Sequence, residues 1–432
     1  MKDFNVVDYG AKPDGISKCT DAIQRAIDDC STEGGRVVFP AGEYLSGSLL
    51  LKSNVELHLE SGAVLVSSLD EADVVDFSKD FVDDNADTGW EGGCFLYACH
   101  ARDITISGFG TIDGQGRKVF YDDEPEDSPK ECPLNVKGFR PRMSFLEDVE
   151  NLTIVDVTFK DAAFWTLHMA GCRNVRIENI RIMNHKRGVN TDGIDPDCCK
   201  NVIIRGCNIV SGDDCIVLKS TAPMYKKYGD CENIIVNSCV LSTCCSAIKI
   251  GTETYGPIHD VIVSDCVLKD CIRGIGIWSR DGGEIYNITM HHISGNTRNF
   301  ADSVLKKAAI YSWWGEGEPV FISAVKRENV DRIPGKVHHV SIDHLMLKSE
   351  APIVVAGEEY SPISDVKITD SVIRMENQSG KTAMVLDERP SVNGRREMKM
   401  PVVYNRGSKD VFVEADIQIG DSIRELFSSM DI

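Results

Sequence analysis

The sequence predicts an all-β protein, a right-handed single-stranded parallel β-helix that spans residues 1–432 as one domain and begins with a capping helix. Two observations predict this fold. A short phrase rich in β-branched residues recurs along the chain, and small or aliphatic residues occupy the same place in each copy. Repeats of this kind are typical of solenoids, in which each coil is covered by its neighbours.

The recurring phrase opens with Asn or Asp and continues with residues that favour strands. Copies begin at Asn151, Asn174, Asn201, Asn233, Asp260 and Asn287, with later copies near His339, Asp365 and Asp410. The first six copies are 23 to 32 residues apart. This spacing is too short for a strand, a helix and a second strand in every repeat, so we expect parallel strands to stack coil on coil.

One position of the repeat accepts cysteine in place of aliphatic residues. Six residues after each start lie Val157, Ile180, Cys207, Cys239, Cys266 and Ile293. A buried thiol behaves as a small hydrophobic group, so we expect this position to face inward and most of the 16 cysteines to pack in the core. The adjacent pairs Cys198–Cys199 and Cys244–Cys245 lack the spacing of a zinc site, and we predict no metal and no cofactor.

The ends of the solenoid and its connections can also be predicted. Residues 19–30 carry an apolar helical stripe, with Thr20 as the expected N-cap, and should cover the first coil. Residues 421–430 are a candidate short helix at the other end. Polar segments rich in Gly and Asp at 69–93, 114–141, 298–336 and 384–408 are long for loops of a compact repeat, so we expect them to border a groove.

Composition excludes several classes of function. The chain has 47 basic and 67 acidic residues and a net charge of −20, without a basic stripe. We therefore expect no nucleic-acid partner and no membrane partner. The same charge repels a long polyanion unless the groove is locally basic or the substrate is short or neutral. Residues 1–7 read as a strand and not as a signal peptide, which favours a cytoplasmic location. The oligomeric state cannot be predicted.

Two acidic phrases carry the candidate chemistry. Residues 190–195 read NTDGID, and residues 211–220 read SGDDCIVLKS. They begin 21 residues apart, about one solenoid turn, so we expect them to stack. Asp213 and Asp214 can face the same side only if the backbone bends, which Gly212 and Gly193 would permit. Crowded carboxylates cannot all ionise easily, so one should remain a proton donor, as glycosidic hydrolysis requires.

The two acidic phrases could also form turns or bind calcium. Asp and Asn beside Gly are common turn formers, and either phrase alone is more often a turn than a site. Calcium also binds clustered aspartates, but it favours spaced oxygen ligands in a flexible loop over an adjacent pair. Because the two phrases lie one turn apart in a repeat fold, we favour a catalytic site.

At these residues the chain resembles family 28 of the glycoside hydrolases, the polygalacturonase family, over essentially its whole length. Three stretches carry the resemblance: residues 4–15 with the helix that follows, the NTDGID phrase and the GDDCIVLKS phrase. Residues 164–168 and 140–142 are similar to segments that line the groove of that family. The resemblance implies a pectin-lyase-like β-helix and an inverting mechanism, in which Asp213 is the general acid, Asp192 and Asp214 hold and deprotonate the water, and Asp195 supports them.

The chain also departs from the family pattern. Ser246 stands where a histidine is usual, and Gly276 and Trp278 replace two cations that pair with a sugar carboxylate. Trp278 would instead stack on a sugar face, and Lys249, Arg273 or Arg280 would restore a cation. The complete set of candidate substrate-binding residues is Arg142, Trp165, His168, Asp195, Lys219, Ser246, Lys249, Arg273, Trp278 and Arg280.

The function predicted from these residues is hydrolysis of an oligosaccharide, either a galacturonan or a rhamnogalacturonan fragment from pectin, by an exo-acting enzyme. Two alternatives stay open. One is a polysaccharide lyase of the same fold, which needs calcium ligands and a basic residue; no arginine or lysine base is evident beside the acids. The other is a noncatalytic β-helix that binds glycans, for which stacked aspartates have no use.

Overall fold

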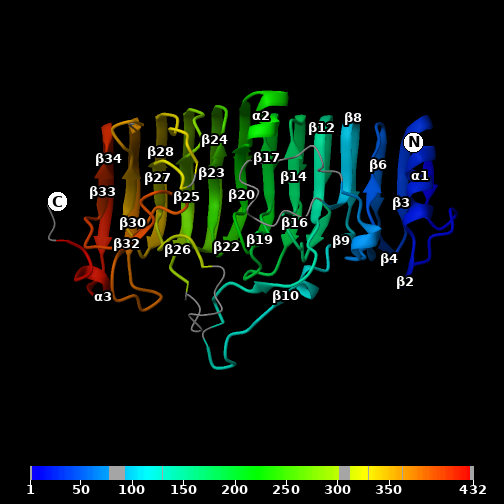
Figure 1. The fold of residues 1–432 in the computed structure, drawn as a ribbon, viewed down its shortest axis with the longest axis horizontal. Helices are drawn as coiled ribbons and strands as arrows, with labels where there is room; N and C mark the ends of the chain where they lie inside the picture. Colours follow the sequence, from blue (N-terminus) through cyan, green and yellow to red (C-terminus); the bar gives the residue numbers. More distant parts are fainter. Residues whose placement is uncertain are drawn as a thin grey trace.

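A computed structural model describes residues 2–76, 93–128, 130–300, 312–328, 330–361 and 363–428. Figure 1 shows the strands arranged side by side along one long axis, with the N-terminal coil at one end and the C-terminal coil at the other. Within the long sheet, strands pair in parallel with strands of the neighbouring coils. The predicted right-handed parallel β-helix is therefore confirmed.

Three parallel ladders form the faces of the solenoid. The first ladder contains β1 (Asp3–Asn5), β3 (Gly35–Phe39), β6 (Val55–Leu59), β8 (Cys94–Gly108), β12 (Arg142–Val155), β15 (Arg173–Glu178), β18 (Lys200–Arg205), β21 (Cys231–Asn237), β24 (Ile258–Cys271), β26 (Ile285–Thr297), β28 (Val337–Ser349), β30 (Ile363–Met375) and β34 (Ser408–Ile419).

The second ladder contains β2 (Asp14–Lys18), β4 (Gly42–Ser46), β7 (Ala63–Ser67), β9 (Thr111–Asp113), β13 (Thr158–Lys160), β16 (Arg181–Met183), β19 (Asn208–Ser211) and β22 (Val240–Thr243), and then joins β24. The third contains β5 (Leu49–Leu50), parts of β8 and β12, β14 (Leu167–Ala170), β17 (Ile194–Asp197), β20 (Ile216–Ser220), β23 (Ser246–Thr254), β25 (Arg273–Ser279), β27 (Val320–Ala324), β29 (Ile353–Ala356) and β33 (Val403–Arg406).

Smaller elements lie outside the ladders. Two antiparallel pairs join β10 (Phe120–Tyr121) to β11 (Asn135–Val136) and β31 (Val385–Asp387) to β32 (Arg395–Glu397). The helices are α1 (Thr20–Glu33), α2 (Ala222–Tyr228) and α3 (Asp421–Arg424), with 3-10 turns η1 (Glu71–Asp73) and η3 (Gly116–Lys118). None of these described helices has the length and apolar character needed to cross a bilayer.

The first residue of the repeated phrase forms a corner of each coil. Asn151, Asn174, Asn201 and Asn233 have φ angles of 55° to 60°, in the left-handed region that Asn tolerates better than most residues. Their side chains form a ladder: the Nδ2 of each donates to the Oδ1 of the one before it at 3.1 Å. The corner thus explains why the phrase opens with Asn or Asp.

Replacing Asn201 with alanine is expected to lower the free energy of unfolding by about 2 kcal/mol, because the variant loses the ladder bonds and places a Cβ-bearing residue in the left-handed region. Asn201→Gly loses the same bonds without the strain and should cost about half as much. Urea unfolding of the two variants measures the difference. Equal losses would contradict a role for the left-handed corner.

The recurring inward position is confirmed. Val157, Ile180, Cys207, Cys239, Cys266 and Ile293 are each at most 1% exposed and belong to one apolar core that runs from the first coil to the last. All 16 cysteines are free thiols, and 15 of them are buried. The prediction that most cysteines pack in the core is therefore confirmed.

The capping helix is present but its start was predicted wrongly. Helix α1 buries Ala22, Ile23, Ala26, Ile27 and Cys30, the stripe expected from the sequence, and it extends to Glu33. Thr20 is not the N-cap; that position belongs to Cys19. The Thr20 hydroxyl instead accepts a hydrogen bond from the Gly47 amide at 2.8 Å, because the first coil packs beside the helix start. At the other end, the described part of the segment 421–430, residues 421–428, is helical over Asp421–Arg424.

Three of the four segments predicted as loops contain strands. Residues 298–336 include β27 and residues 384–408 include β31, β32 and β33, since their short apolar runs extend the third ladder or form a hairpin. Residues 114–141 include the β10–β11 pair. Much of the segment 69–93, and residues 301–311, lie outside the described residues.

Candidate active site

The two acidic phrases lie against one another on the third ladder, as predicted. The Gly193 amide donates to the Asp214 carbonyl at 2.9 Å, and the Ile194 amide donates to the Cys215 carbonyl at 3.0 Å. Strand β17 begins within the first phrase and pairs with β20, which lies within the second. The phrases therefore place their carboxylates on neighbouring coils.

The backbone bends at Gly212 and Asp213, between β19 and β20. A Cβ on Gly212 would lie 2.0 Å from the Gly188 carbonyl oxygen, and one on Gly193 would lie 2.4 Å from that of Cys215. Neither glycine has a positive φ. The predicted bend is present, and these glycines are required by close packing of backbone on backbone.

A pocket of about 480 Å³ opens over this bend. This volume lies within the range of small-molecule sites. Its walls come from the acidic phrases, from β20 and β23, and from the segments 114–141, 298–336 and 384–408. The lining residues are Pro133, Phe164, Trp165, Val189, Asn190, Asp192, Asp213, Asp214, Lys219, Cys245, Lys249, Thr252, Glu253, Ser312, Trp313, Trp314, Arg327, Arg389 and Pro390.

Hydrogen bonds tie the three segments together at the pocket. The Trp313 indole Nε1 donates to the Glu131 carbonyl at 2.7 Å, which joins 298–336 to 114–141. The Arg389 guanidinium donates to the Ser312 hydroxyl at 2.6 Å and to the Trp313 carbonyl at 2.7 Å, which joins 384–408 to 298–336. As predicted, these segments border the candidate site.

The adjacent aspartates have opposite electrostatic surroundings. Burial and the neighbouring Asp214 charge raise the pKa of Asp213, so its carboxyl group retains a proton to higher pH. Burial alone would also raise the pKa of Asp214, but the ammonium groups of Lys249 and Lys219 lower it below its ordinary value. Lys249 Nζ lies 2.7 Å from Asp214 Oδ2, and the Ser246 amide donates to Oδ1 at 3.1 Å. Asp213 therefore keeps its proton to higher pH than Asp214 does.

A second group of charges surrounds Lys219. Its Nζ lies 3.3 Å from Glu253 Oε2, 3.6 Å from Asp195 Oδ1 and 3.8 Å from Asp192 Oδ2. Burial and the charge of Asp213 raise the pKa of Asp192 well above its ordinary value. Burial likewise raises the pKa of Asp195 to about 8, and neither of its carboxyl oxygens has a hydrogen-bond partner among the described residues. Both carboxyl groups thus favour the protonated form.

The raised pKa of Asp195 predicts a pH-dependent stability. Between the ordinary pKa of 3.8 and about 8, the folded protein holds a proton that the unfolded chain has released, so stability falls as the pH rises through this window. Asp195→Asn cannot titrate and should gain up to about 4 kcal/mol relative to the wild type between pH 5 and pH 8. Urea midpoints at both pH values measure this. Parallel profiles for the two proteins would contradict a buried, protonated Asp195.

Of the predicted substrate-binding residues, Trp165, Lys219 and Lys249 line the pocket. Arg142, His168, Asp195 and Ser246 lie behind its wall, each at most 1% exposed. The Arg142 guanidinium lies over the rings of Phe145, Phe164 and Trp165, and His168 Nε2 lies 3.4 Å from Asp197 Oδ2. Burial lowers the pKa of His168 to about 4. In the free protein these four residues support the wall and do not reach the cavity.

The prediction that Trp278 stacks on a sugar was wrong in this structure. Its ring is fully buried between the Phe321 ring, at 5.9 Å between centroids, and the Lys249 ammonium, 4.2 Å above its face. Arg273 and Arg280 are also fully buried. Arg273 pairs with Glu318 at 3.2 Å, so its charge is directed away from the cavity.

Both arginines instead anchor the segment 384–408. Arg273 Nη2 donates to the Asp387 carbonyl at 2.6 Å, and Arg280 donates to the carbonyls of Pro390 and Glu388 at 3.2 and 3.4 Å. The sequence does not reveal these contacts, because the partners lie more than 100 residues away. The prediction of direct substrate binding by Arg273 and Arg280 is corrected accordingly.

Several pocket residues were not predicted. Glu253, Arg327 and Arg389 line the cavity. Arg327 and Arg389 lie in the segments 298–336 and 384–408, where the repeat pattern gives no register. The signal that would have found them is the expectation that these segments border a groove, combined with the arginines that the segments carry.

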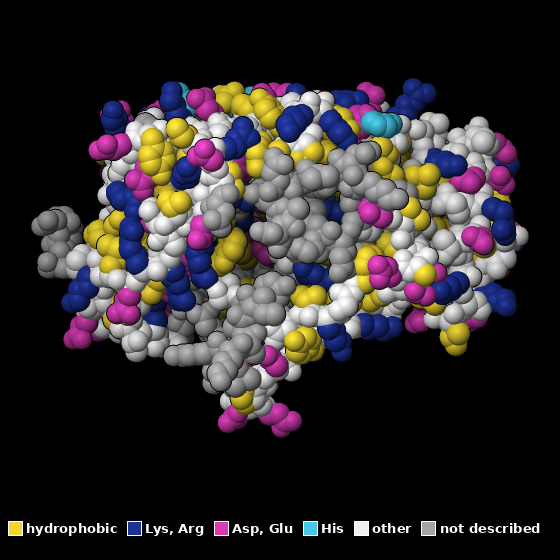
Figure 2. Space-filling view, in the orientation of Figure 1, with side chains coloured by type: hydrophobic (Ala, Val, Ile, Leu, Met, Phe, Trp, Pro, Cys, Tyr) yellow, Lys and Arg dark blue, Asp and Glu magenta, His cyan; other side chains and the backbone are white. Residues whose placement is uncertain are grey.

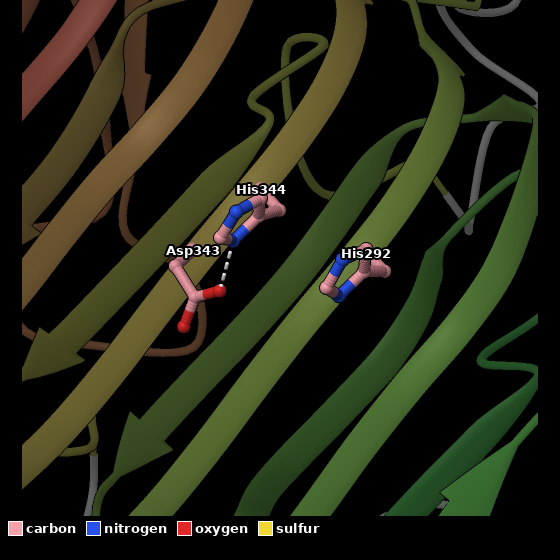
Figure 3. Close-up of side chains that lie close together, drawn as sticks. All are labelled: His292, Asp343 and His344. Atoms are coloured by element: carbon pink, nitrogen blue, oxygen red, sulfur yellow. Dashed lines mark hydrogen bonds and ion pairs between the residues drawn. The ribbon is translucent and has the colours of Figure 1, made fainter.

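A separate cluster on another face joins β26 to β28. Figure 3 shows the His344 ring directed at Asp343, with the His292 ring beside it on the neighbouring strand. His344 Nδ1 lies 2.5 Å from Asp343 Oδ1, and the two imidazole rings are stacked 4.6 Å apart at 6°. Nitrogen lone pairs lie in the ring planes, and two parallel planes share no point at which one ion could bind. We therefore assign this cluster no metal.

Comparisons with known proteins agree with this geometry. The family model described as Glycosyl hydrolases family 28 matches residues 40–311. A probable polygalacturonase of Vitis vinifera is 33% identical over 226 residues, which are 50% of this chain and 44% of that protein. Plasmin and fibronectin-binding protein A of Streptococcus pneumoniae is 34% identical over 188 residues, which are 42% of this chain and 24% of that protein. The chain therefore spans less than half the length of these relatives.

The fold has a solved counterpart. The crystal structure of a hyperthermoactive exopolygalacturonase from Thermotoga maritima superposes with a TM-score of 0.68, with 24% identity and 89% of each chain covered. At this identity the likeness shows the fold alone. The superposition covers more of the chain than the family match to residues 40–311, so the shared fold includes most of the solenoid.

Proposed function

Because the chain belongs to family 28 of the glycosyl hydrolases, we propose that it hydrolyses glycosidic bonds in pectin-derived oligosaccharides at the pocket over the aspartate bend. The observation that carries this proposal is the adjacent pair in the pocket, Asp213 with a raised pKa and Asp214 with a lowered one. Two carboxyl groups whose surroundings separate their pKa values are what acid and base catalysis by a glycosidase requires.

The reaction assigns one step to each aspartate. Asp213 donates its proton to the glycosidic oxygen as the bond to the anomeric carbon breaks. Asp214, kept ionised by Lys249, accepts a proton from the water that attacks that carbon from the opposite face. Asp192, whose pKa is raised, holds this water by a hydrogen bond. Direct attack by water inverts the configuration of the anomeric carbon.

The lysines beside the aspartates bear on the alternative that the protein is a polysaccharide lyase. Contrary to the expectation from sequence, two lysines, Lys219 and Lys249, lie among the acids. Burial would lower their pKa values, but the surrounding carboxylates raise both above the ordinary value. A lysine that removes a proton from carbon must first be neutral. These protonated lysines favour hydrolysis over elimination.

An exo mode is supported by the walls of the pocket. The segments 114–141, 298–336 and 384–408 are bonded to one another through Trp313 and Arg389 beside the aspartates. Such walls suit a chain end better than the middle of a long polymer. We therefore propose release of terminal residues, as the name of the Thermotoga maritima protein states for that enzyme.

Product release tests the proposed function. The wild type and Asp213→Asn are incubated with galacturonan, rhamnogalacturonan fragments and neutral-sugar glycosides in the presence of a chelator, and new reducing ends are measured. We expect turnover of at least one substrate that the substitution abolishes. Turnover that survives the substitution, or none at all, would contradict it.

The alternative function, binding without catalysis, has one observation in its favour. The relative from Streptococcus pneumoniae is named for binding plasmin and fibronectin, and it is 34% identical over the matched residues. A binding protein has no use for a carboxyl pair with divergent pKa values, which places this alternative second. Retained glycan binding by a wild type that shows no turnover would favour it.

A further inference from the structure

We propose that the sugar unit held in this pocket beside Asp213 is uncharged, and not a uronate. The inference rests on the proposed glycosidase function and names its substrate class. It follows from the charges that line the cavity, because each cation there already has a carboxylate partner. Four cations among the described lining residues decide the matter: Lys219, Lys249, Arg327 and Arg389.

The two lysines are committed to the acidic phrases. Lys249 Nζ lies 2.7 Å from Asp214 Oδ2, the distance of a charge-assisted hydrogen bond. Lys219 Nζ lies within 3.8 Å of Asp192, Asp195 and Glu253. Both lysines are 4% exposed, so a substrate carboxylate would have to displace an existing partner to reach their ammonium groups.

The two arginines are held in the same way. Arg327 Nη2 lies 2.9 Å from Asp281 Oδ2 and 3.5 Å from Glu253 Oε1. Arg389 pairs with both oxygens of Asp387, at 2.8 and 2.7 Å, in the bidentate arrangement that arginine offers to carboxylates. Two of its other N–H groups donate to the segment 298–336. The fork that would recognise a uronate is therefore already occupied by the protein.

The pairing of cations with carboxyl groups also favours an uncharged sugar. The four cations face four acidic residues in the lining, and the partners Asp195, Asp281 and Asp387 add three more beneath it. With the carboxyl groups of raised pKa in protonated form, three carboxylates remain for the four cations, and each cation still lies within 3.5 Å of one of them. A uronate brought into this buried site would lose its hydration without a free cation to replace it.

The remaining lining suits a neutral sugar. Phe164, Trp165, Trp313 and Trp314 bring aromatic surface to the cavity, and aromatic rings contact the apolar faces of sugars without any demand for charge. Outside the pocket, Figure 2 shows acidic and basic side chains interspersed over the described part of this face, with no continuous basic track that would guide a polyanion.

Matched substrates test the inference. They are an α-linked galacturonide oligosaccharide, its C6 methyl ester and its C6-reduced galactose counterpart, together with α-rhamnosides and α-xylosides of the same length. We expect kcat/KM to be at least tenfold higher for a neutral member than for any uronate. Cleavage of the uronate as fast as every neutral member would overturn the inference and leave the proposed function standing. No cleavage of any member would overturn both.

A charge-removing variant gives a second readout. Glu253→Gln keeps the shape of a side chain that contacts Lys219 and Arg327 and removes one negative charge from beside them. We expect the ratio of kcat/KM for the galacturonide to that for its C6-reduced counterpart to rise about tenfold. Glu232→Gln is the matched control, since it removes the same charge from a surface pair with Lys200. An unchanged ratio in Glu253→Gln, or an equal rise in the control, would overturn the inference.

Discussion

Replacing Asp213 with asparagine is expected to lower kcat on oligosaccharides by about a thousandfold, the effect of losing a general acid. The amide has nearly the same shape but cannot give a proton to the departing glycosidic oxygen. Asp213 is the half-buried member of the pair and the one whose pKa is raised by burial and by the Asp214 charge. KM should change little, because the substitution removes an interaction that matters in the transition state.

A substrate whose leaving group needs no proton distinguishes a general acid at Asp213 from a residue with only a structural role. A 4-nitrophenolate departs without protonation, so Asp213→Asn should lose less than about tenfold on a nitrophenyl glycoside of the same sugar. Asp214→Asn removes the proposed base and should slow both substrates alike, by about a thousandfold. Steady-state kinetics on the paired substrates measure these ratios. An equal loss on both substrates in Asp213→Asn would contradict its assignment as the acid.

Replacing Lys249 with methionine is expected to lower kcat/KM at neutral pH by about a hundredfold. Lys249 Nζ, 2.7 Å from Asp214 Oδ2, holds the pKa of this carboxyl group below its ordinary value in spite of burial. Without the ammonium group the pKa of Asp214 rises, and the proposed base becomes protonated in the range where it must be ionised. The acidic limb of the pH–rate profile should therefore move to higher pH, with partial recovery of activity above neutrality.

Stability should fall in the same variant. A buried carboxylate left without its partner costs about 3 to 5 kcal/mol. The pKa of Asp214 is depressed in the folded wild type, so its contribution is present above the ordinary carboxyl pKa and is lost as the pH falls. Lys200→Met removes a lysine from the exposed pair with Glu232 and serves as the control. An acidic limb that stays in place in Lys249→Met would contradict the assigned partnership.

The fold could be predicted from sequence because each coil repeats the same local requirements. Asn201 and its equivalents mark a left-handed corner, and Cys207 and its equivalents mark an inward position, so a single pattern fixes the register of many strands. The segments 298–336 and 384–408 lack that pattern. Their strands β27 and β33 form by adding to the third ladder, an interaction between distant parts of the chain that the sequence does not display.

The same difference, between residues in the repeat and residues covered by long segments, holds in the candidate site. Asp192, Asp213 and Asp214 lie in the repeat and were placed together correctly. Trp278 and Arg280 were expected in the groove, yet the segment 384–408 and β27 cover them. A residue buried by a neighbouring coil and one exposed in a groove have the same local sequence. Only the packing of long segments distinguishes the two.

The central claim, that water attacks the anomeric carbon directly at the aspartate pair, is tested most directly by the stereochemistry of the product. Proton NMR follows the digestion of an α-linked oligosaccharide by the wild type and identifies the anomer that forms first, before mutarotation. Direct attack by water predicts that the β-anomer of the released sugar appears first. First appearance of the α-anomer, or of an unsaturated sugar, would contradict it.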